Sequence, residues 1–426
     1  MKTDILIVGS GCAGLYCALQ LPRDRKITLI CKTKAEESDS FLAQGGICVL
    51  REEADYDAFF EDTMRAGHYE NDLESVAIMI RSSRAVIDDL VSYGVQFARE
   101  ADGSLKYTRE GAHSSPRILF HEDVTGQEIT SKLLARVKEL DNVTLLEHTT
   151  LLDILENEGR CVGAVLRMQD GSIGTLSAQY TVLATGGIGG LYKHSTNFPH
   201  LTGDALAIAI RHGVALQNPD YVQIHPTTFY TENAEERSFL ISESVRGEGA
   251  KLYNKDMQRF VNELLPRDQL TAAIYEQMEK DGSDHVWEDL RTIPEKELKK
   301  HFPNIVEHCR KMGYDVTKEC IPVVPAQHYF MGGIKVDHYS KTTMEALYAV
   351  GETACNGVHG KNRLASNSLL ESLVFAGRAA GQMASTELAR LPLPKVDVNA
   401  YRDAKALEQS YRASVLSEIK KEKAYV

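Results

Sequence analysis

Apolar residues near the N-terminus form a short continuous run that is followed by a helical pattern. Residues 5–8 are all aliphatic, which is typical of a buried parallel strand, and apolar positions over 15–21 recur at helical spacing. Gly9, Gly11 and Gly14 lie between them at G-x-G-x-x-G spacing. In such a turn the first glycine permits the tight bend, the second lets a phosphate approach the backbone, and the third lets the helix pack on the strand. The pattern predicts a dinucleotide-binding unit.

Strand and helix patterns alternate over most of the chain, which predicts an α/β fold. We expect strands at 26–31, 117–120 and 346–352, and a β-rich ribbon over 143–183 that runs into a second glycine-rich turn up to residue 190. We expect helices at 55–97, 127–138, 204–210 and 366–384. Residues 219–329 alternate less regularly, so we predict a capping domain there, inserted into a nucleotide-binding domain of 1–218 and 330–391. Residues 392–426 predict a short helical tail.

Composition limits the kinds of partner and location. The 426 residues are 43% hydrophobic and 25% charged, with a formal net charge of −12. A negative chain has little general affinity for nucleic acid or anionic membrane, so an anionic ligand needs a local cationic pocket. No apolar run approaches the roughly 20 residues of a membrane span, and the first strand begins near the N-terminus, so we expect a cytoplasmic location. The eight cysteines are scattered without a C-x-x-C pair, which predicts reduced thiols and no metal site.

The end of the second predicted strand weakens an NAD interpretation, and the glycine-bearing turns described next favour FAD. An NAD-binding unit carries an acidic residue there to hold a ribose hydroxyl, whereas this strand ends in Cys31-Lys32. Ribose contact is then left to the backbone or to Lys32.

Further glycine-bearing turns at strand ends suit one long, extended ligand. They occur in DSFLAQGGI at 39–47, in ATGGIGG at 184–190 and in Gly351-Glu352. The carboxylate of Glu352 is a good acceptor for sugar hydroxyls. The helix that begins near Ser368 would point its N-terminus at the flavin pyrimidine, which gains negative charge on reduction.

Five cationic or imidazole side chains lie in loop contexts flanked by Pro, Gly or Asn. They are His225, Arg246, Arg267, His328 and Arg363. A single arginine of this kind is ordinary on a protein surface, but together they surround the loops predicted to face the flavin. Because guanidinium forks match carboxylates in a bidentate way, the set predicts a pocket for a small dianion.

A series of motifs now resembles one family over nearly the whole chain. DILIVGSGCAGL, AQGGI, ATGGIGG, IHPT, RGEGA, PRD, HYFMGGI, AVGE and NRLASNSLLE occur in this order, and together they resemble the succinate dehydrogenase/fumarate reductase flavoprotein family. The resemblance implies an α/β, Rossmann-like FAD-binding domain with an inserted α+β capping domain. The expected FAD contacts are Gly9, Ser10, Gly11, Cys12, Ala13, Gly14, Lys32, Asp39, Ser40, Phe41, Leu42, Ala43, Gln44, Gly45, Gly46, Leu151, Leu152, Asp204, Glu352, Ser368 and Leu369.

Two local features resemble the aspartate-oxidising members of that family more than its respiratory members. Glu110, in TREGAHS, stands where the respiratory enzymes carry a neutral amide, and a substrate with an ammonium group favours a carboxylate there. The respiratory enzymes attach FAD to a histidine five residues before the Gln of AQGG. Counting back from Gln44 reaches Asp39, so we expect FAD to be held without a covalent bond.

The resemblance implies the oxidation of L-aspartate to iminoaspartate, a first step toward quinolinate and NAD, with O2 or fumarate as electron acceptor. A hydride would leave Cα for flavin N5, and iminoaspartate could pass to a quinolinate synthase. The substrate carboxylates would lie among His225, Ser242, Arg246, His328 and Arg363, with Glu110 facing the amino group. Ser242 stands where the family often has Thr, and keeps the hydroxyl. Arg267 matches the arginine that moves a proton in fumarate reduction.

Two other hypotheses remain open at this point. One is a fumarate reductase or succinate dehydrogenase flavoprotein subunit on an iron–sulfur partner, against which Glu110 and Asp39 argue. The other is a flavin-fold binding protein without chemistry, which the intact set of cations disfavours. Longer relatives carry a larger C-terminal helical domain, whereas residues 392–426 are all that follow Leu391 here.

Overall fold

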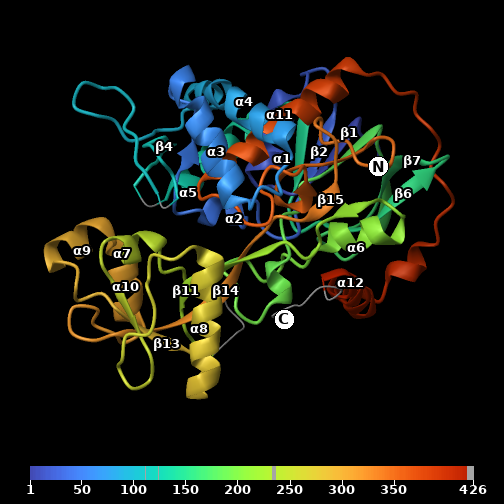
Figure 1. Cartoon of the computed structure of the whole chain (residues 1–426). Coiled ribbons are helices and arrows are strands. Elements are labelled where there is room, and N and C mark those ends of the chain that lie inside the picture. The colour runs from blue at the N-terminus through green and yellow to red at the C-terminus, as the bar shows by residue number, and fades with distance from the viewer. Residues whose placement is uncertain (111, 123, 233–236, 420–426) are drawn as a thin grey trace.

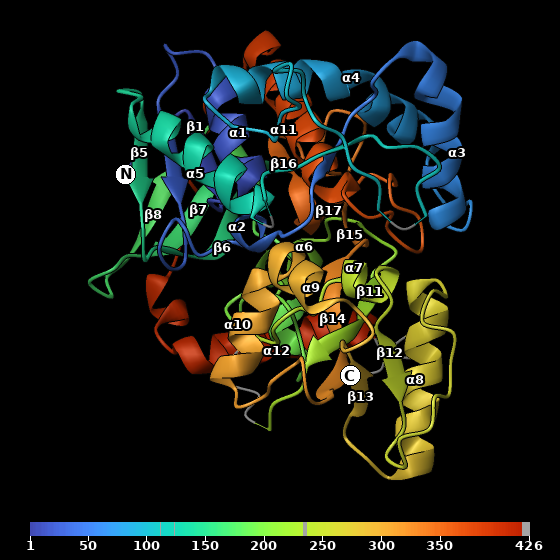
Figure 2. The ribbon, with the colours of Figure 1, turned by 90° about the vertical axis from the view of Figure 1, so that its left-hand side faces the viewer.

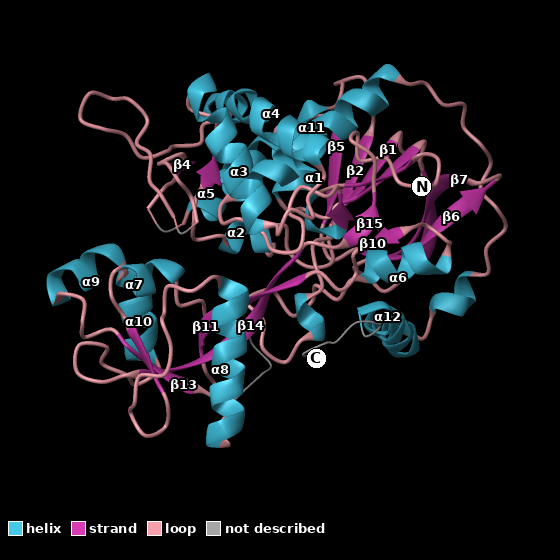
Figure 3. Ribbon diagram, in the orientation of Figure 1, coloured by secondary structure: helices cyan, strands magenta, loops and turns pink. Residues whose placement is uncertain are grey.

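A five-stranded parallel sheet lies at the centre of the molecule (Figure 1, Figure 3). The computed structural model describes residues 1–110, 112–122, 124–232 and 237–419. The strand order is β16-β9-β1-β2-β5, and all neighbouring pairs are parallel. The strands are β1 (Ile5–Val8), β2 (Ile27–Ile30), β5 (Val143–Leu146), β9 (Tyr180–Leu183) and β16 (Leu347–Ala349). The predicted α/β class is therefore confirmed.

The first strand is apolar throughout because both faces of the sheet are covered. Ile5 and Ile7 join a core with the helices of one face, whereas Leu6 and Val8 join a core on the other face. Figure 1 shows α1, α4 and α11 gathered on the first face. The helices of this layer are α1 (Cys12–Gln20), α2 (Asp39–Leu42), α3 (Tyr56–Ala66), α4 (Leu73–Ser92), α5 (Thr125–Lys138) and α11 (Asn367–Ser385).

An antiparallel ribbon and two helices cover the second face. They are β6 (Thr150–Asn157), β7 (Arg160–Arg167), β8 (Ile173–Ser177), α6 (Asp204–Arg211) and α12 (Ala404–Ile419). The predicted ribbon is confirmed, and Gly159 and Gly171 in its two turns have positive φ. The tail is fixed here by a buried carboxylate, because the Tyr401 hydroxyl donates to Asp153 over 2.8 Å and Arg211 lies 3.2 Å from the same group.

The inserted region forms a cap on one side of this body (Figure 2). Its antiparallel sheet has the order β11-β14-β13-β12 and encloses a core of its own. The elements are β11 (Val222–Phe229), α7 (Glu243–Gly247), β12 (Lys251–Tyr253), α8 (Arg267–Asp281), β13 (Val286–Asp289), α9 (Glu295–His301), α10 (Pro303–Lys311) and β14 (Ile321–Phe330). The long paired strands β11 and β14 link the cap to the body (Figure 1). The boundaries predicted at 219 and 329 fall beside these strands, and the division into domains stays a proposal.

The region predicted to be helical over 55–97 contains two helices, α3 and α4, with a break between them. The chain turns at Gly67, and His68 and Tyr69 then adopt positive φ. Asp72 starts the second helix because its carboxylate accepts the Ser75 N–H over 2.8 Å, an N-cap that the apolar periodicity does not report.

Shorter elements complete the described chain. They are β3 (Ile47–Cys48), β4 (Ile118–Leu119), β10 (Leu216–Gln217), β15 (Gly333–Lys335), β17 (Ala354–Cys355), and the 3-10 turns η1 (Glu53–Asp55), η2 (Gly189–Leu191), η3 (Gly351–Thr353) and η4 (Val398–Tyr401). Gly111 of the TREGAHS motif and residues 420–426 of the predicted tail lie outside the described residues. All eight cysteines are free and buried. Within the described ranges no helix has the length and apolar character needed to cross a membrane.

The glycine turn makes a specific prediction about stability. A Cβ on Gly14 would lie 2.1 Å from the Gly9 carbonyl oxygen, so Gly14→Ala should push α1 off β1 and lower the free energy of unfolding by several kcal/mol, roughly 2–5. Gly381 in α11 is the control, because a Cβ there meets nothing within 4 Å and Gly381→Ala should stabilise the protein by ~1 kcal/mol. Urea unfolding measures both changes, and equal stability of the two variants would contradict this packing role.

Candidate active site

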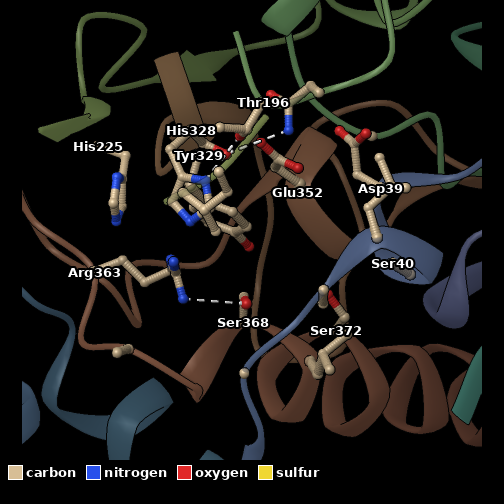
Figure 4. Close-up of a pocket in the computed structure, with 18 of the residues that line it drawn as sticks. Asp39, Ser40, Thr196, His225, His328, Tyr329, Glu352, Arg363, Ser368 and Ser372 are labelled. Atoms are coloured by element: carbon tan, nitrogen blue, oxygen red, sulfur yellow. Dashed lines mark hydrogen bonds between the residues drawn. The ribbon is translucent and has the colours of Figure 1, made fainter. Parts of the chain in front are cut away.

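One large cavity lies where the carboxyl ends of the sheet strands meet the cap. Its volume is about 1150 Å³, above the roughly 300–1,000 Å³ of most small-molecule pockets. Its lining comes from the glycine turn after β1, the end of β2, α2, the start of α11, and the cap strands and helices. Figure 4 shows His225 and Arg363 on one side of this space and Asp39, Ser40 and Glu352 on another. The position at the strand ends is the one at which α/β proteins bind ligands.

The glycine turns leave a strip of bare backbone beside the cavity. Gly9 has φ +119°, and a Cβ there would lie 2.0 Å from the Ala184 carbonyl oxygen. A Cβ on Gly46 would lie 2.2 Å from an Ile118 methyl group. Helix α1 has no side-chain cap, and the Ser40 hydroxyl accepts its Cys12 N–H over 3.1 Å. This uncapped N-terminus beside bare backbone suits a diphosphate.

Lys32 closes one end of the cavity through a local ion pair. Its ammonium lies 2.6 Å from an Asp204 carboxylate oxygen and donates to the His200 carbonyl over 2.9 Å. The Thr202 hydroxyl donates to the other Asp204 oxygen over 2.6 Å. Both Lys32 and Asp204 line the cavity, so the end of β2 offers a lysine–aspartate pair in place of a single acidic residue.

Two buried carboxyls, those of Asp39 and Glu352, also line the cavity. Glu352 accepts the Phe330 N–H over 2.8 Å, and Asp39 accepts the Phe198 N–H over 3.0 Å. Burial raises the pKa of each carboxyl well above its ordinary value. The second oxygen of Asp39 is buried without a partner among the described residues. Both acids therefore have capacity left for a ligand with hydroxyl or N–H donors.

The two strands that link the cap to the body bring two histidines together. His225 on β11 and His328 on β14 have ring centroids 5.4 Å apart, and irregular pairing on both sides of Ile224 in β11 lets the rings approach. Nδ1 of His225 lies 3.0 Å from the Thr227 carbonyl, and Nδ1 of His328 lies 2.8 Å from the Thr196 hydroxyl. Burial, and next the charge of Arg267, lower both histidine pKa values well below 6.5, so both rings are neutral.

Three arginines surround the histidines, and two of them have unused donors. Nε and Nη2 of Arg246, and Nε of Arg363, are buried without a partner among the described residues. Arg363 also donates to the Ser368 hydroxyl over 3.3 Å (Figure 4), and burial followed by the charge of Arg267 lowers its pKa to about 10. Because a buried guanidinium with unused donors is strongly unfavourable, the arrangement calls for an anion.

Arg267, at the start of α8, is held by two side chains. It donates to a Glu243 oxygen over 2.7 Å and to the Gln223 amide oxygen over 3.1 Å. Burial acts to raise the pKa of Glu243, but the charges of Arg267 and Arg246 outweigh burial and lower this pKa. Arg267 is thus a fixed cation with an ionised partner.

Glu110 faces this cationic cluster from the body of the molecule. Its carboxylate accepts the Ser366 hydroxyl over 2.6 Å, next to the N-terminus of α11. Burial raises its pKa, against the opposing effects of the Ser366 hydrogen bond and the charge of Arg267. Beside these three arginines, the cavity therefore offers the carboxylate of Glu110 to a positive group.

A fully buried arginine positions the loop that carries Glu110. Arg117 donates to Asp62 over 2.6 Å and to both oxygens of Asp55 over 3.0 Å. Asp62 also accepts the Ser114 N–H over 2.7 Å, so this network ties α3 to the loop after Glu110. Although burial opposes them, these hydrogen bonds lower the pKa of Asp62.

The cavity brings together all seven residues predicted for substrate or catalysis. These are Glu110, His225, Ser242, Arg246, Arg267, His328 and Arg363. It is also lined by 17 predicted cofactor residues, namely Gly9, Ser10, Gly11, Ala13, Lys32, Asp39, Ser40, Leu42, Ala43, Gln44, Gly45, Gly46, Leu151, Asp204, Glu352, Ser368 and Leu369.

Four predicted cofactor residues do not line the cavity. Leu152 packs in a core with Tyr401, because neighbours on a strand point to opposite faces and Leu151 takes the cavity side. Phe41 follows Ser40 on the one-turn helix α2, where successive side chains point about 100° apart. Gly14 serves helix packing, and the side chain of Cys12 is buried beside the Ser40 hydroxyl.

Two residues of the cavity, Glu243 and Tyr329, were not predicted from the sequence. Tyr329 lies inside the motif HYFMGGI, and Glu243 lies three residues before Arg246, the first residue of the motif RGEGA. Their importance comes from the residues that they contact, which the sequence does not show. Glu243 pairs with Arg267, and the Tyr329 ring lies 4.7 Å from the Arg363 guanidinium. No spacing in the sequence reports such contacts between distant elements.

Comparisons with known proteins agree with this geometry. Residues 4–369 match the family model described as an FAD binding domain. The L-aspartate oxidase of Clostridium perfringens is 49% identical over 377 residues, which is 88% of this chain and 85% of that protein. That of Clostridium acetobutylicum is 48% identical over 380 residues, 89% of this chain and 87% of that protein. A point mutant of E. coli quinol fumarate reductase FrdA is 30% identical, with a TM-score of 0.83 and coverage of 99% of this chain and 74% of its own.

Removing the acid at the centre of the Arg117 network should disturb both stability and the loop. Asp62→Asn should lower the free energy of unfolding by ~3–5 kcal/mol, because it leaves Arg117 buried with one carboxylate fewer. The depressed pKa of Asp62 means that its contribution holds above about pH 4 and is lost as pH falls. Urea unfolding at pH 7 and pH 3.5 measures this. Asp57→Asn, on the exposed side of α3, should change stability by under ~0.5 kcal/mol, and a similar loss in both variants would contradict the role of the network.

Proposed function

This chain belongs to the L-aspartate oxidase family of FAD-binding flavoproteins and is an FAD-dependent oxidoreductase that oxidises L-aspartate, and we propose that the cavity beneath the cap is where it does so. The observation that carries this placement is the cluster of Arg246, Arg267 and Arg363, with unused buried donors, facing the carboxylate of Glu110. A four-carbon diacid with one ammonium group has matching charges.

The residues of the body fit FAD. The bare backbone at Gly9 and Gly46 and the uncapped start of α1 would take the diphosphate, the Lys32–Asp204 pair the adenosine ribose, and Glu352 a hydroxyl of the ribityl chain. When bound, FAD supplies a two-electron acceptor for the hydride that leaves Cα of aspartate. Asp39 has no imidazole to form a covalent link, so we propose that FAD is held non-covalently.

The cage of cations would bind and orient the two substrate carboxylates. Arg246 and Arg363 have the unused donors, and the hydroxyl of Ser242 lines the same cavity. Nδ1 of His225 can accept the Thr227 N–H over 3.2 Å, and Nδ1 of His328 can accept the Thr196 hydroxyl over 2.8 Å. In that tautomer Nε2 of each neutral ring carries the hydrogen and can donate to a carboxylate oxygen. Fixing both ends of the diacid would align Cα before reaction.

Glu110 would select an amino acid over a plain diacid. An ionised carboxylate at this point attracts an ammonium group, whereas it repels a third negative charge. Because its pKa is raised, Glu110 takes up a proton at higher pH than an ordinary glutamate, and affinity for aspartate should fall as pH falls through that value.

Arg267 would hold a carboxylate and, in fumarate reduction, pass a proton to the substrate, as the matching arginine does in the family. Free arginine is almost never deprotonated, but Glu243 at 2.7 Å is an ionised neighbour that can exchange a proton with it. To hold a carboxylate, Arg267 need only stay charged, whereas to pass on a proton it must lose one.

Fumarate and O2 are the electron acceptors we propose, and the first has the same diacid shape as the product. We further propose a cytoplasmic location, and that iminoaspartate is consumed on the route to quinolinate and NAD, with transfer to a quinolinate synthase as one form of that step. A fumarate reductase or succinate dehydrogenase subunit is the alternative function, and the carboxylate of Glu110 disfavours it because succinate has no ammonium group.

An anaerobic titration tests the function. Adding L-aspartate to the yellow holoprotein should bleach the flavin absorbance, and fumarate should then restore it. Arg267→Leu should keep its FAD but stay yellow with aspartate. Bleaching by succinate with no response to aspartate would favour the alternative function, and no bleaching by either would indicate a binding protein.

Glu110→Gln tests the selectivity of the cavity. We expect kcat/KM for aspartate to fall at least ~100-fold, since a charge-assisted contact worth about 3 kcal/mol is lost. Fumarate reduction by the same variant, driven by a reduced dye, should change less than ~5-fold and is the internal control. Equal losses in both reactions would remove the reason for placing the ammonium group at Glu110.

A further inference from the structure

Glu288 is a buried carboxyl in the core of the cap that the roles above leave unused. It lies on β13 and is 0% exposed. Val286, two residues earlier on the same face, belongs to the apolar core of the cap. Neither carboxyl oxygen of Glu288 has a hydrogen-bond partner among the described residues. A carboxylate in such surroundings either takes up a proton or requires a cation.

Arg246 is the cation that faces Glu288. The charge of Arg246 opposes the effect of burial on the pKa of Glu288, and Glu288 in turn favours the charged form of Arg246. Arg246 lines the cavity, donates through Nη1 to the Glu263 carbonyl over 2.7 Å, and keeps Nε and Nη2 without a partner in the described chain. Leu252, the register partner of Glu288, donates its N–H to the side chain of Glu263, whose carbonyl accepts Arg246, so Arg246 both reaches the surroundings of Glu288 and lines the cavity.

The other titratable groups that face Glu288 are few. Glu263, in the loop between β12 and α8, adds a negative charge but is itself held by Arg259 over 2.7 Å and by the Leu252 N–H over 3.1 Å. The Cys309 thiol on α10 is buried and neutral, because burial raises its pKa to about 12. Burial, opposed by Arg246 and aided by Glu263, raises the pKa of Glu288 to about 8.

We propose that Glu288 is a positioning residue that sets how much charge Arg246 offers to the substrate, taking up a proton from solvent when a dicarboxylate binds and releasing it when the cavity empties. An ionised Glu288 would neutralise Arg246 and repel the incoming dianion through it, whereas the neutral acid leaves the whole charge for the ligand. This inference rests on the proposed function, in that it places a substrate carboxylate at Arg246.

Binding of succinate to the oxidised holoenzyme tests this coupling without turnover. Titrations followed by the flavin absorbance from pH 6 to pH 9.5 should show a Kd that is flat at low pH and rises toward tenfold per pH unit above about pH 8, as Glu288 ionises. Glu288→Gln should lose this rise. Asp289→Asn is the matched control, since Asp289 is the next residue on β13 and pairs with Arg291 over 2.8 Å instead, and it should keep the wild-type profile.

Two further measurements distinguish proton uptake by Glu288 from a general loss of stability in the variant. Calorimetry at pH 9 in buffers of different ionisation enthalpy should show close to one proton more taken up by wild type than by Glu288→Gln. The unfolding midpoint of Glu288→Gln relative to wild type should rise from pH 5 to pH 8, because the native carboxyl keeps its proton while the unfolded one loses it. Glu288→Leu, which fills the apolar core, should repeat the flat Kd profile if the Gln variant folds poorly.

The failure of the Glu288 coupling and the failure of the proposed function give different results. A Glu288→Gln variant with wild-type pH dependence and proton uptake would overturn the coupling, while bleaching by aspartate would leave the proposed function intact. A wild-type holoenzyme that binds no four-carbon diacid at any pH would instead remove the proposed function, and the coupling with it.

Discussion

The whole site depends on one electrostatic constraint, namely that three guanidinium groups line one cavity closely enough for the charge of Arg267 to lower the pKa of the other two beyond the effect of burial. Glu243 satisfies Arg267, but donors of Arg246 and Arg363 stay unused in the described chain. Like charges in a medium of low polarity repel strongly. The unused donors suit a small dianion, and burial together with the charge of Arg267 keeps both histidines neutral.

The positions of these groups follow from how the cap is attached. Strands β11 and β14 carry the two histidines and are also the link between cap and sheet, so the imidazoles sit at the junction of the two bodies. Arg246 and Arg267 belong to the cap, whereas Glu110 and Arg363 belong to the body. Gly9, Gly11, Gly45 and Gly46, which line the cavity, lie in the body. The charged groups of the cavity are thus shared between cap and body.

Much of the fold was predictable because its signals are local. The apolar run of β1, the glycine turn and the helix α1 follow from neighbouring residues, and so did the ribbon of β6 to β8. The break between α3 and α4 was missed because a capping Asp72 is a side-chain contact and not a matter of periodicity. The cations of the site were predicted from motifs, yet Glu243 and Glu288 were not, since their importance lies in which distant arginine each one faces. Leu152 was misplaced by a single residue, because alternation along β6 gives the cavity to Leu151.

The split of the cage between cap and body has an electrostatic consequence. The charge of Arg267 on the cap disfavours the charged form of Arg363 on the body, while it favours the charged form of Glu110 there. A dianion between the two arginines would offset the first of these effects, whereas a neutral analogue of the same size would not.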